Sequence, residues 1–255
     1  MAEGKFYTPN LLQPYQLTNS VAVFEGMAQL GMADLLRPPF TDIQIAKSVK
    51  KFVEDFTHRG NFRSLLQTYI KEDSDLDPNK FALFVHKGRY DSDNTPPFKH
   101  FYFDSFTNLV LLYGNKKNGA CVTGGIELRK SIEDTEGLED SDMQDDDLII
   151  NQLQGPTHKV EVENVGSRFS GFRWEKLLVE IFSIWTRQSG LKKIYLLPSK
   201  FSDWSEVKMN INGTSFLRYD VTARRSGFRR GNDNEPYKKE CFVMPDGLFK
   251  ILLEK

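Results

Sequence analysis

Cysteine is scarce in this chain of 255 residues, and long apolar runs are missing. The two cysteines, Cys121 and Cys241, are too few for the disulfide framework of a small secreted domain, and they indicate thiols in a reducing compartment. Neither stands in a Cys-x-x-Cys motif or a Cys/His array, so no metal site is expected. No apolar run approaches the roughly 18 residues of a membrane-spanning helix, and the amino terminus lacks the pattern of a signal peptide. We therefore expect a cytoplasmic protein that does not enter a membrane.

An excess of one charge sign is also absent. The chain has 34 Lys and Arg residues against 35 Asp and Glu residues, so its formal net charge is -1. This balance gives no overall attraction to nucleic acid or to an anionic membrane. Apolar residues make up 39% of the chain and include 20 phenylalanines, which indicates a globular core rich in aromatic packing. The length suits one large domain, or one domain with an added element.

The first readable part of the chain predicts helices. The stretch TDIQIAKSVKKFVEDF, which starts at Thr41, has apolar residues at spacings of three and four, and Thr41 or Asp42 can cap it. A second helix, RSLLQTYI, is expected from Arg63. The stretch DSDLDP from Asp73 lacks the glycine and the final acid of a calcium loop, so we interpret it as a solvated turn.

The middle of the chain predicts strands. Four candidates are FALFVHKG from Phe81, KHFYFDSF from Lys99, NLVLLYGN from Asn108 and ACVTGGIEL from Ala120. The last two flank an Asn-Gly pair that favours a tight hairpin turn. Residues 131–154 then break the pattern, because they include IEDTEGLEDSDMQDDD, with nine acids and no base. Such a block repels itself, so we expect a mobile loop over residues 131–154.

A strand, a turn, a helix and a second strand are expected after this acidic loop. Residues 159–165 alternate apolar and acidic side chains, as a strand does, and residues 166–172 form the turn. Apolar residues from Trp174 to Trp185 recur at three and four, and Gly190 then ends the helix. Residues 193–197 give a short apolar strand. Two strands joined by such a helix usually lie parallel with a right-handed crossover.

The turn before this helix can bind an anion. The amino terminus of a helix has unpaired backbone N–H groups and a partial positive charge. Gly171 lets the backbone approach a ligand closely, and Arg168 and Arg173 add permanent positive charge. Together they favour a phosphate or pyrophosphate site. The alternative is an ordinary strand-to-helix turn, because Arg-x-x-Gly alone is a common pattern.

The residues Arg168-Phe169-Ser170-Gly171-Phe172-Arg173 resemble the Gln/Arg-x-x-Gly-x-Gly/Ala motif of GNAT acetyltransferases. The motif lies between the fourth strand and the following long helix of that family, and here Arg173 replaces its last small residue. Residues 218–228 look like the penultimate helix of the family, which ends in Gly-Phe before a strand such as YKKECFVMP. The hairpin from Asn108 is similar to the second and third strands of the family. The resemblance covers residues 102–245.

The resemblance implies an α/β fold of α+β type. It has a mixed, mostly antiparallel sheet, in which a central pair of parallel strands splays apart and helices flank the sheet. Residues 101–255 would form the acyltransferase core, with the acidic loop 131–154 inserted. Residues 1–100 would be a helix and strand region, partly integral to the same domain. Acyl-CoA would lie in the gap between the splayed strands, with its pyrophosphate on the backbone of Phe169, Ser170, Gly171, Phe172 and Arg173 and near Arg168.

The implied reaction is transfer of an acetyl group from acetyl-CoA, the co-substrate, to an amine of a small molecule or a protein. Holding a lysine-like amine neutral at pH 7 costs roughly 4 to 5 kcal/mol, so a base is expected. Glu161 and Glu163 share one face of the expected strand and are the candidates. The family often places the acid for the departing thiolate where Ala223 stands, and Tyr219, one helical turn earlier, is the substitute. The alternatives are solvated carboxylates and a packing tyrosine.

Two other functions stay open. A catalytically silent GNAT-like module that binds a partner or a CoA metabolite is favoured by Arg173 and Ala223. A nucleic-acid binder is suggested by a basic cluster near Phe228, namely Arg224, Arg225, Arg229 and Arg230. The neutral net charge argues against that second alternative, so no nucleic-acid partner is expected.

Overall fold

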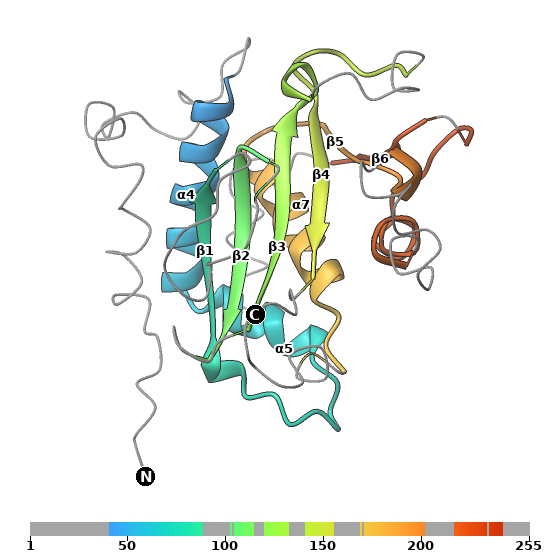
Figure 1. The fold of residues 1–255 in the computed structure, drawn as a ribbon. Helices are drawn as coiled ribbons and strands as arrows, with labels where there is room; N and C mark the ends of the chain where they lie inside the picture. Colours follow the sequence, from blue (N-terminus) through green and yellow to red (C-terminus); the bar gives the residue numbers. More distant parts are fainter. Residues whose placement is uncertain are drawn as a thin grey trace.

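A mixed sheet of six strands organises the described part of the chain in this computed structural model (Figure 1). The described residues are 41–88, 103, 105–114, 120–132, 141–155, 169, 171–201, 217–233 and 235–241. The strand order is β1-β2-β3-β4-β5-β6, and only β4 and β5 are parallel neighbours. The expectation of a mixed, mostly antiparallel sheet with helices is confirmed. The strands are β1 Phe81–Lys87, β2 Thr107–Tyr113, β3 Ala120–Leu128, β4 Leu148–Gln154, β5 Lys193–Leu196 and β6 Tyr237–Glu240.

Helix α4, Asp42–His58, begins at the predicted cap. The hydroxyl of Thr41 accepts a hydrogen bond from the backbone N–H of Gln44 at 3.3 Å, and Gln44 Oε1 accepts from the Thr41 N–H at 2.8 Å. This reciprocal pair satisfies two N–H groups at the start of the helix. Helix α5, Asn61–Tyr69, follows Gly60, which has a φ of 75°. Both predicted amino-terminal helices are therefore present.

Helices α4 and α7, Trp174–Gln188, share one apolar core against the sheet. The stripe from Trp174 to Trp185 is buried, and Trp185 is fully enclosed. The Trp185 indole N–H donates to Ser48 Oγ of α4 at 3.0 Å, which joins the two helices by a buried hydrogen bond. The predicted stripe, its end at Gly190 (φ 74°) and the strand after it are confirmed. Part of the amino-terminal region thus belongs to the same core.

The strand that leads into this unit is β4, which corrects two expectations. Strand β5 lies between β4 and β6, so its parallel partner is β4 and not residues 159–165, which lie outside the described residues. Residues 148–154 were expected within the acidic loop, but the acids end at Asp147 and the apolar Leu148, Ile149 and Ile150 complete the sheet. Burial of these three side chains outweighs the charge of the preceding block.

The remaining predictions are met in part. Of KHFYFDSF only residues 103, 105 and 106 are described, and the hairpin turn at 116–119 and residues 133–140 lie outside the described part. The expected penultimate helix begins as a π-helical turn, Leu217–Val221, and continues as the short α10, Thr222–Arg225. Strand β6 follows as predicted. Both cysteines are buried free thiols.

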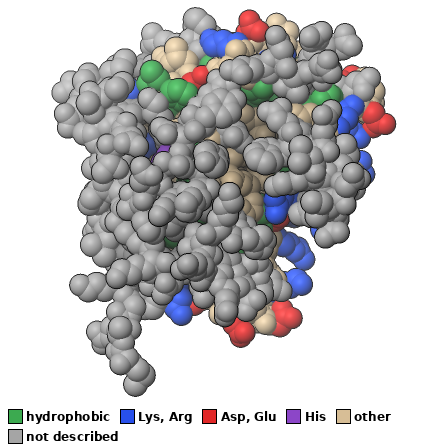
Figure 2. Space-filling view, viewed as in Figure 1, with side chains coloured by type: hydrophobic (Ala, Val, Ile, Leu, Met, Phe, Trp, Pro, Cys, Tyr) green, Lys and Arg blue, Asp and Glu red, His purple; other side chains and the backbone are tan. Residues whose placement is uncertain are grey.

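In the described ranges, no three His, Cys, Asp or Glu side chains gather as a metal site would need. None of the helices in those ranges combines the length and apolar character needed to cross a bilayer. On the face drawn in Figure 2, basic and acidic side chains both lie along the rim.

Candidate functional site

Strands β4 and β5 part soon after they meet (Figure 1). They pair only at Ile149 with Tyr195 and Ile150 with Leu196, and the N–H of Leu197 then donates to the Ile150 carbonyl at 3.0 Å. Strand β4 continues to Gln154 beside β3 alone among the described strands. The last residues of β4 therefore have an edge without a strand neighbour in the described part of the chain.

A bulge lies on β4 where the two strands separate. Ile126 of β3 faces Ile150, and Gly125 faces Gln152, so Asn151 is the extra residue. The side chain of Asn151 donates to Glu127 Oε2 at 2.8 Å and accepts from the hydroxyl of Ser105. Glu127 is 1% exposed and Ser105 is fully buried, so this polar group fixes the bulge from inside the protein.

The π-helical segment, Leu217–Val221, fills the space beside the open edge of β4. The N–H of Leu153 donates to the hydroxyl of Tyr219 at 3.0 Å, and Tyr219 is 7% exposed. Asp220 is turned the other way, and accepts from the Ser199 N–H at 3.1 Å and the Tyr237 hydroxyl at 3.2 Å. The segment therefore spans the gap between β4 and the two strands beyond it. π-Helical turns are rare and frequently occur at functional sites.

Arg218 places a guanidinium at the end of β4. A Cβ atom added to Gly155 would lie 2.6 Å from its Nη2, so the group lies directly against the Gly155 backbone. Its Cζ is 5.8 Å from the centre of the Trp174 ring, at the start of α7. Burial raises the pKa of the nearby Glu175 above its ordinary value of 4.5, while its own backbone N–H and Arg218 oppose that rise. The first turn of α7, a half-buried carboxyl and a guanidinium thus meet here.

The predicted phosphate turn is described at four of its six positions. Gly171 has a φ of 81°, a conformation that other residues rarely adopt. The N–H of Phe172 donates to the Phe169 carbonyl at 3.0 Å, and the N–H of Arg173 donates to the Tyr69 carbonyl at 3.1 Å. Two of the backbone groups expected to meet a phosphate are therefore bonded within the protein. Arg173 itself is exposed, so its side chain is not packed into the turn.

The structure brings some predicted site residues together and leaves others apart. The hydroxyl of Tyr219 meets the open edge of β4. The rings of Phe169 and Phe172 pack on Phe81 in the core, with centres 6.3 and 5.1 Å away. Four candidates, Glu161, Glu163, Arg168 and Ser170, lie outside the described residues.

Comparisons with known proteins add no relative. No family model, no curated protein and no solved structure matches the chain. Membership of the GNAT family therefore stays a prediction from the sequence motif.

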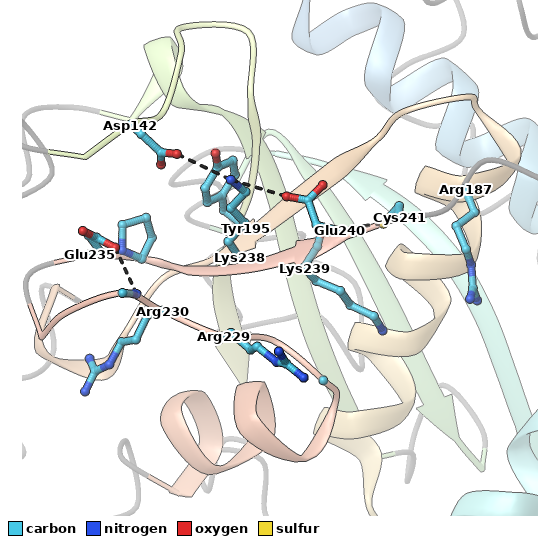
Figure 3. Close-up of a pocket in the computed structure, with 13 residues that line it drawn as sticks. Asp142, Arg187, Tyr195, Arg229, Arg230, Glu235, Lys238, Lys239, Glu240 and Cys241 are labelled. Carbon is cyan, nitrogen blue, oxygen red and sulfur yellow. Dashed lines mark hydrogen bonds and ion pairs between the residues drawn. The ribbon is translucent and has the colours of Figure 1, made fainter.

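A concave region lies beside β6 and has a volume of about 930 Å³ (Figure 3). Lys238 pairs with Asp142 at 3.5 Å and Glu240 at 3.4 Å, while Lys239 extends toward α7 and lies 3.6 Å from Glu180. Charged side chains on an edge strand disfavour pairing with another chain. The region is lined by five basic residues and three acids: Arg187, Arg229, Arg230, Lys238, Lys239, Asp142, Glu235 and Glu240.

The basic cluster near Phe228 has internal partners. Phe228 is 3% exposed and lies under the ammonium of Lys239, so its ring is not available to stack on a base. Arg224 donates to the Tyr237 hydroxyl at 3.1 Å, and Arg230 pairs with Asp233 at 2.6 Å. These contacts give two of the four arginines a structural role, which weakens the nucleic-acid alternative.

Proposed function

We propose that the chain is a GNAT-type N-acetyltransferase that moves an acetyl group from acetyl-CoA to an amine of a small molecule or a protein. One observation carries the proposal. The parallel strands β4 and β5 part after two residue pairs, and the Leu153 N–H on the open edge meets a tyrosine hydroxyl. A backbone donor at the parting of two parallel strands is suited to hold the carbonyl oxygen of a thioester.

The open edge of β4 supplies groups for both halves of the reaction. The amine nitrogen attacks the thioester carbonyl, a C–N bond forms, and the oxygen gains negative charge that the Leu153 N–H can stabilise. The C–S bond then breaks and the thiolate takes a proton. An acyl oxygen on the Leu153 N–H would replace the Tyr219 hydroxyl as acceptor, and that hydroxyl would donate its proton to the sulfur. The amine proton would pass to Glu161 or Glu163.

The ligand's pyrophosphate would lie at the first turn of α7. The helix dipole and the unpaired N–H groups at its start favour an anion there. Gly171→Asp should abolish CoA binding, because it adds bulk and negative charge at a residue with a φ of 81°.

A catalytically silent GNAT-like module is the second candidate. The N–H groups of Phe172 and Arg173 are already bonded to carbonyls of the protein, which leaves fewer donors for a phosphate. Ala223, at the position where the family often has its acid, is fully buried. Such a module would bind a partner or a CoA metabolite and transfer nothing.

Two measurements on the full chain separate these functions. Calorimetric titration with acetyl-CoA reports binding, and release of free thiol in the presence of polyamines or lysine peptides reports transfer. Tyr219→Phe should leave binding intact and slow thiol release by roughly 10- to 100-fold. Tyr195→Phe is the matched control, because it removes a buried phenol from β5 that bonds Lys193 instead of β4. Binding without thiol release indicates the silent module, and no binding at millimolar acetyl-CoA refutes the proposal.

A further inference from the structure

Among the described residues, packing contacts hold the guanidinium of Arg218, and no ion pair does. It is half-buried between the backbone of Gly155 and the ring of Trp174. Within the described ranges, no hydrogen bond or salt bridge joins it to another side chain. Its electrostatic neighbour is Glu175. Burial raises the pKa of that carboxyl, and the charge of Arg218 opposes part of the rise.

This position is unfavourable for a cation in the absence of a ligand. The start of a helix carries a partial positive charge of about half an elementary charge, so it repels a nearby guanidinium. Partial burial adds a desolvation cost that an ion pair would normally offset. Glu175 offsets part of that repulsion, but burial raises its pKa and so disfavours its charged form. The end of β4 therefore combines two sources of positive potential.

We propose that Arg218 binds a phosphate group of the CoA ligand. The planar guanidinium presents paired N–H donors that match two phosphate oxygens, and its charge complements theirs. The sequence predicted this role for Arg168, which lies outside the described residues, and for Arg173, whose side chain is exposed. The inference rests on the proposed function, because it names the residue that recognises the anionic end of the same ligand.

Two neighbours of Arg218 are part of the proposal. Gly155 provides the space for the guanidinium, since any side chain there would collide with Nη2 or Cζ, at 2.6 and 3.0 Å from its Cβ. The carboxyl of Glu175 lies close to the guanidinium, and its charged form would oppose a bound phosphate. Tyr219, the next residue, ties the same segment to β4. Binding at Arg218 thus places the phosphate end of the ligand on the segment that carries the candidate acid.

The test compares CoA with pantetheine, which lacks the phosphates, by calorimetric titration of the full chain. Arg218→Gln should weaken CoA binding by about 10- to 100-fold and leave pantetheine binding unchanged. Arg225→Gln is the matched control, because Arg225 is an exposed arginine of α10. Gly155→Ala displaces the guanidinium without removing its charge and should also weaken CoA binding. Glu175→Gln should strengthen it.

Each outcome decides one question. If Arg218→Gln weakens CoA binding no more than Arg225→Gln does, this inference is wrong and the proposed function is unaffected. An equal loss for CoA and pantetheine means that Arg218 only supports the fold, which also overturns it. Absence of CoA binding by the unmodified chain overturns the proposed function together with this inference.

Discussion

Replacing Ser48 with alanine should destabilise the protein by leaving the indole N–H of Trp185 buried without an acceptor. Both side chains are fully enclosed, and the bond between them is 3.0 Å long. A buried donor without a partner costs about 1 to 3 kcal/mol, so that is the expected loss in the free energy of unfolding. The bond joins α4 to α7, so the effect measures how firmly the amino-terminal helix belongs to the core.

A double-mutant cycle isolates the bond from the packing. Trp185→Phe removes the donor and part of the ring, and should cost about 2 to 4 kcal/mol. In the double variant neither partner is left unsatisfied, so its loss should be smaller than the sum by about 1 kcal/mol. Urea unfolding followed by far-ultraviolet circular dichroism gives the four free energies without dependence on tryptophan fluorescence.

Thr186→Val is the matched control. Its hydroxyl is also buried in α7, but it donates to the Phe182 carbonyl of the same helix at 2.8 Å, so its loss leaves no contact between helices broken. We expect a loss of about 0.5 to 1.5 kcal/mol, the net contribution of one such hydrogen bond. Suppose that Ser48→Ala lowers the free energy of unfolding no more than Thr186→Val does, and that the cycle shows no coupling. In that case α4 does not pack against α7, and the two helices do not share one core.

Three further predictions concern the sheet and the site. Burial raises the pKa of Glu175 above 4.5, so the folded state holds this proton more tightly than the unfolded state does, and the free energy of unfolding falls as the pH rises above 4.5. Glu175→Gln should therefore raise the free energy of unfolding at neutral pH and make it less dependent on pH, as measured by urea titrations. Gly125→Ala should cost about 1 to 3 kcal/mol because the new Cβ meets the side chain of Ser105, and Ser105→Gly should restore part of the loss in the same assay. Asp220→Asn should lower the melting temperature and cost roughly 2 to 4 kcal/mol, because an amide nitrogen replaces an oxygen that accepts from Ser199 or Tyr237; an unchanged melting temperature would show that the π-helical segment is not anchored there.

Local patterns in the sequence predicted the helices and the later strands well. The cap at Thr41, the stripe from Trp174 to Trp185 and the stop at Gly190 each depend on residues within a few positions, and all are present. Strand β4 was missed because its apolar start directly follows a dense run of acids, which dominates the local composition. The three apolar residues that begin β4 are too short a run to predict a strand without knowledge of its neighbours in the sheet.

A residue of the candidate site could be predicted from the sequence only where a nearby motif pointed to it. Tyr219 could be named because it lies one helical turn before the motif position that Ala223 fills, but its partner is the backbone N–H of Leu153, and no sequence pattern marks such a group. Arg218 was passed over because it meets Gly155 and Trp174, which are distant in the sequence. Contacts of this kind depend on the tertiary arrangement of the separated strands.

The extra residue at Asn151 shifts the alternation of side chains along β4 by one position. Before it, Leu148 and Ile150 face the helices; after it, the odd-numbered Leu153 does so instead. Since side chains and backbone N–H groups alternate together along a strand, the same shift decides which edge the Leu153 N–H addresses. If Asn151 instead took its place in a regular alternation, Gln152 would enter the core beneath α7 and the Leu153 N–H would turn toward β3. The bulge at Asn151 thus sets both which side chains the core receives and which donor the open edge offers.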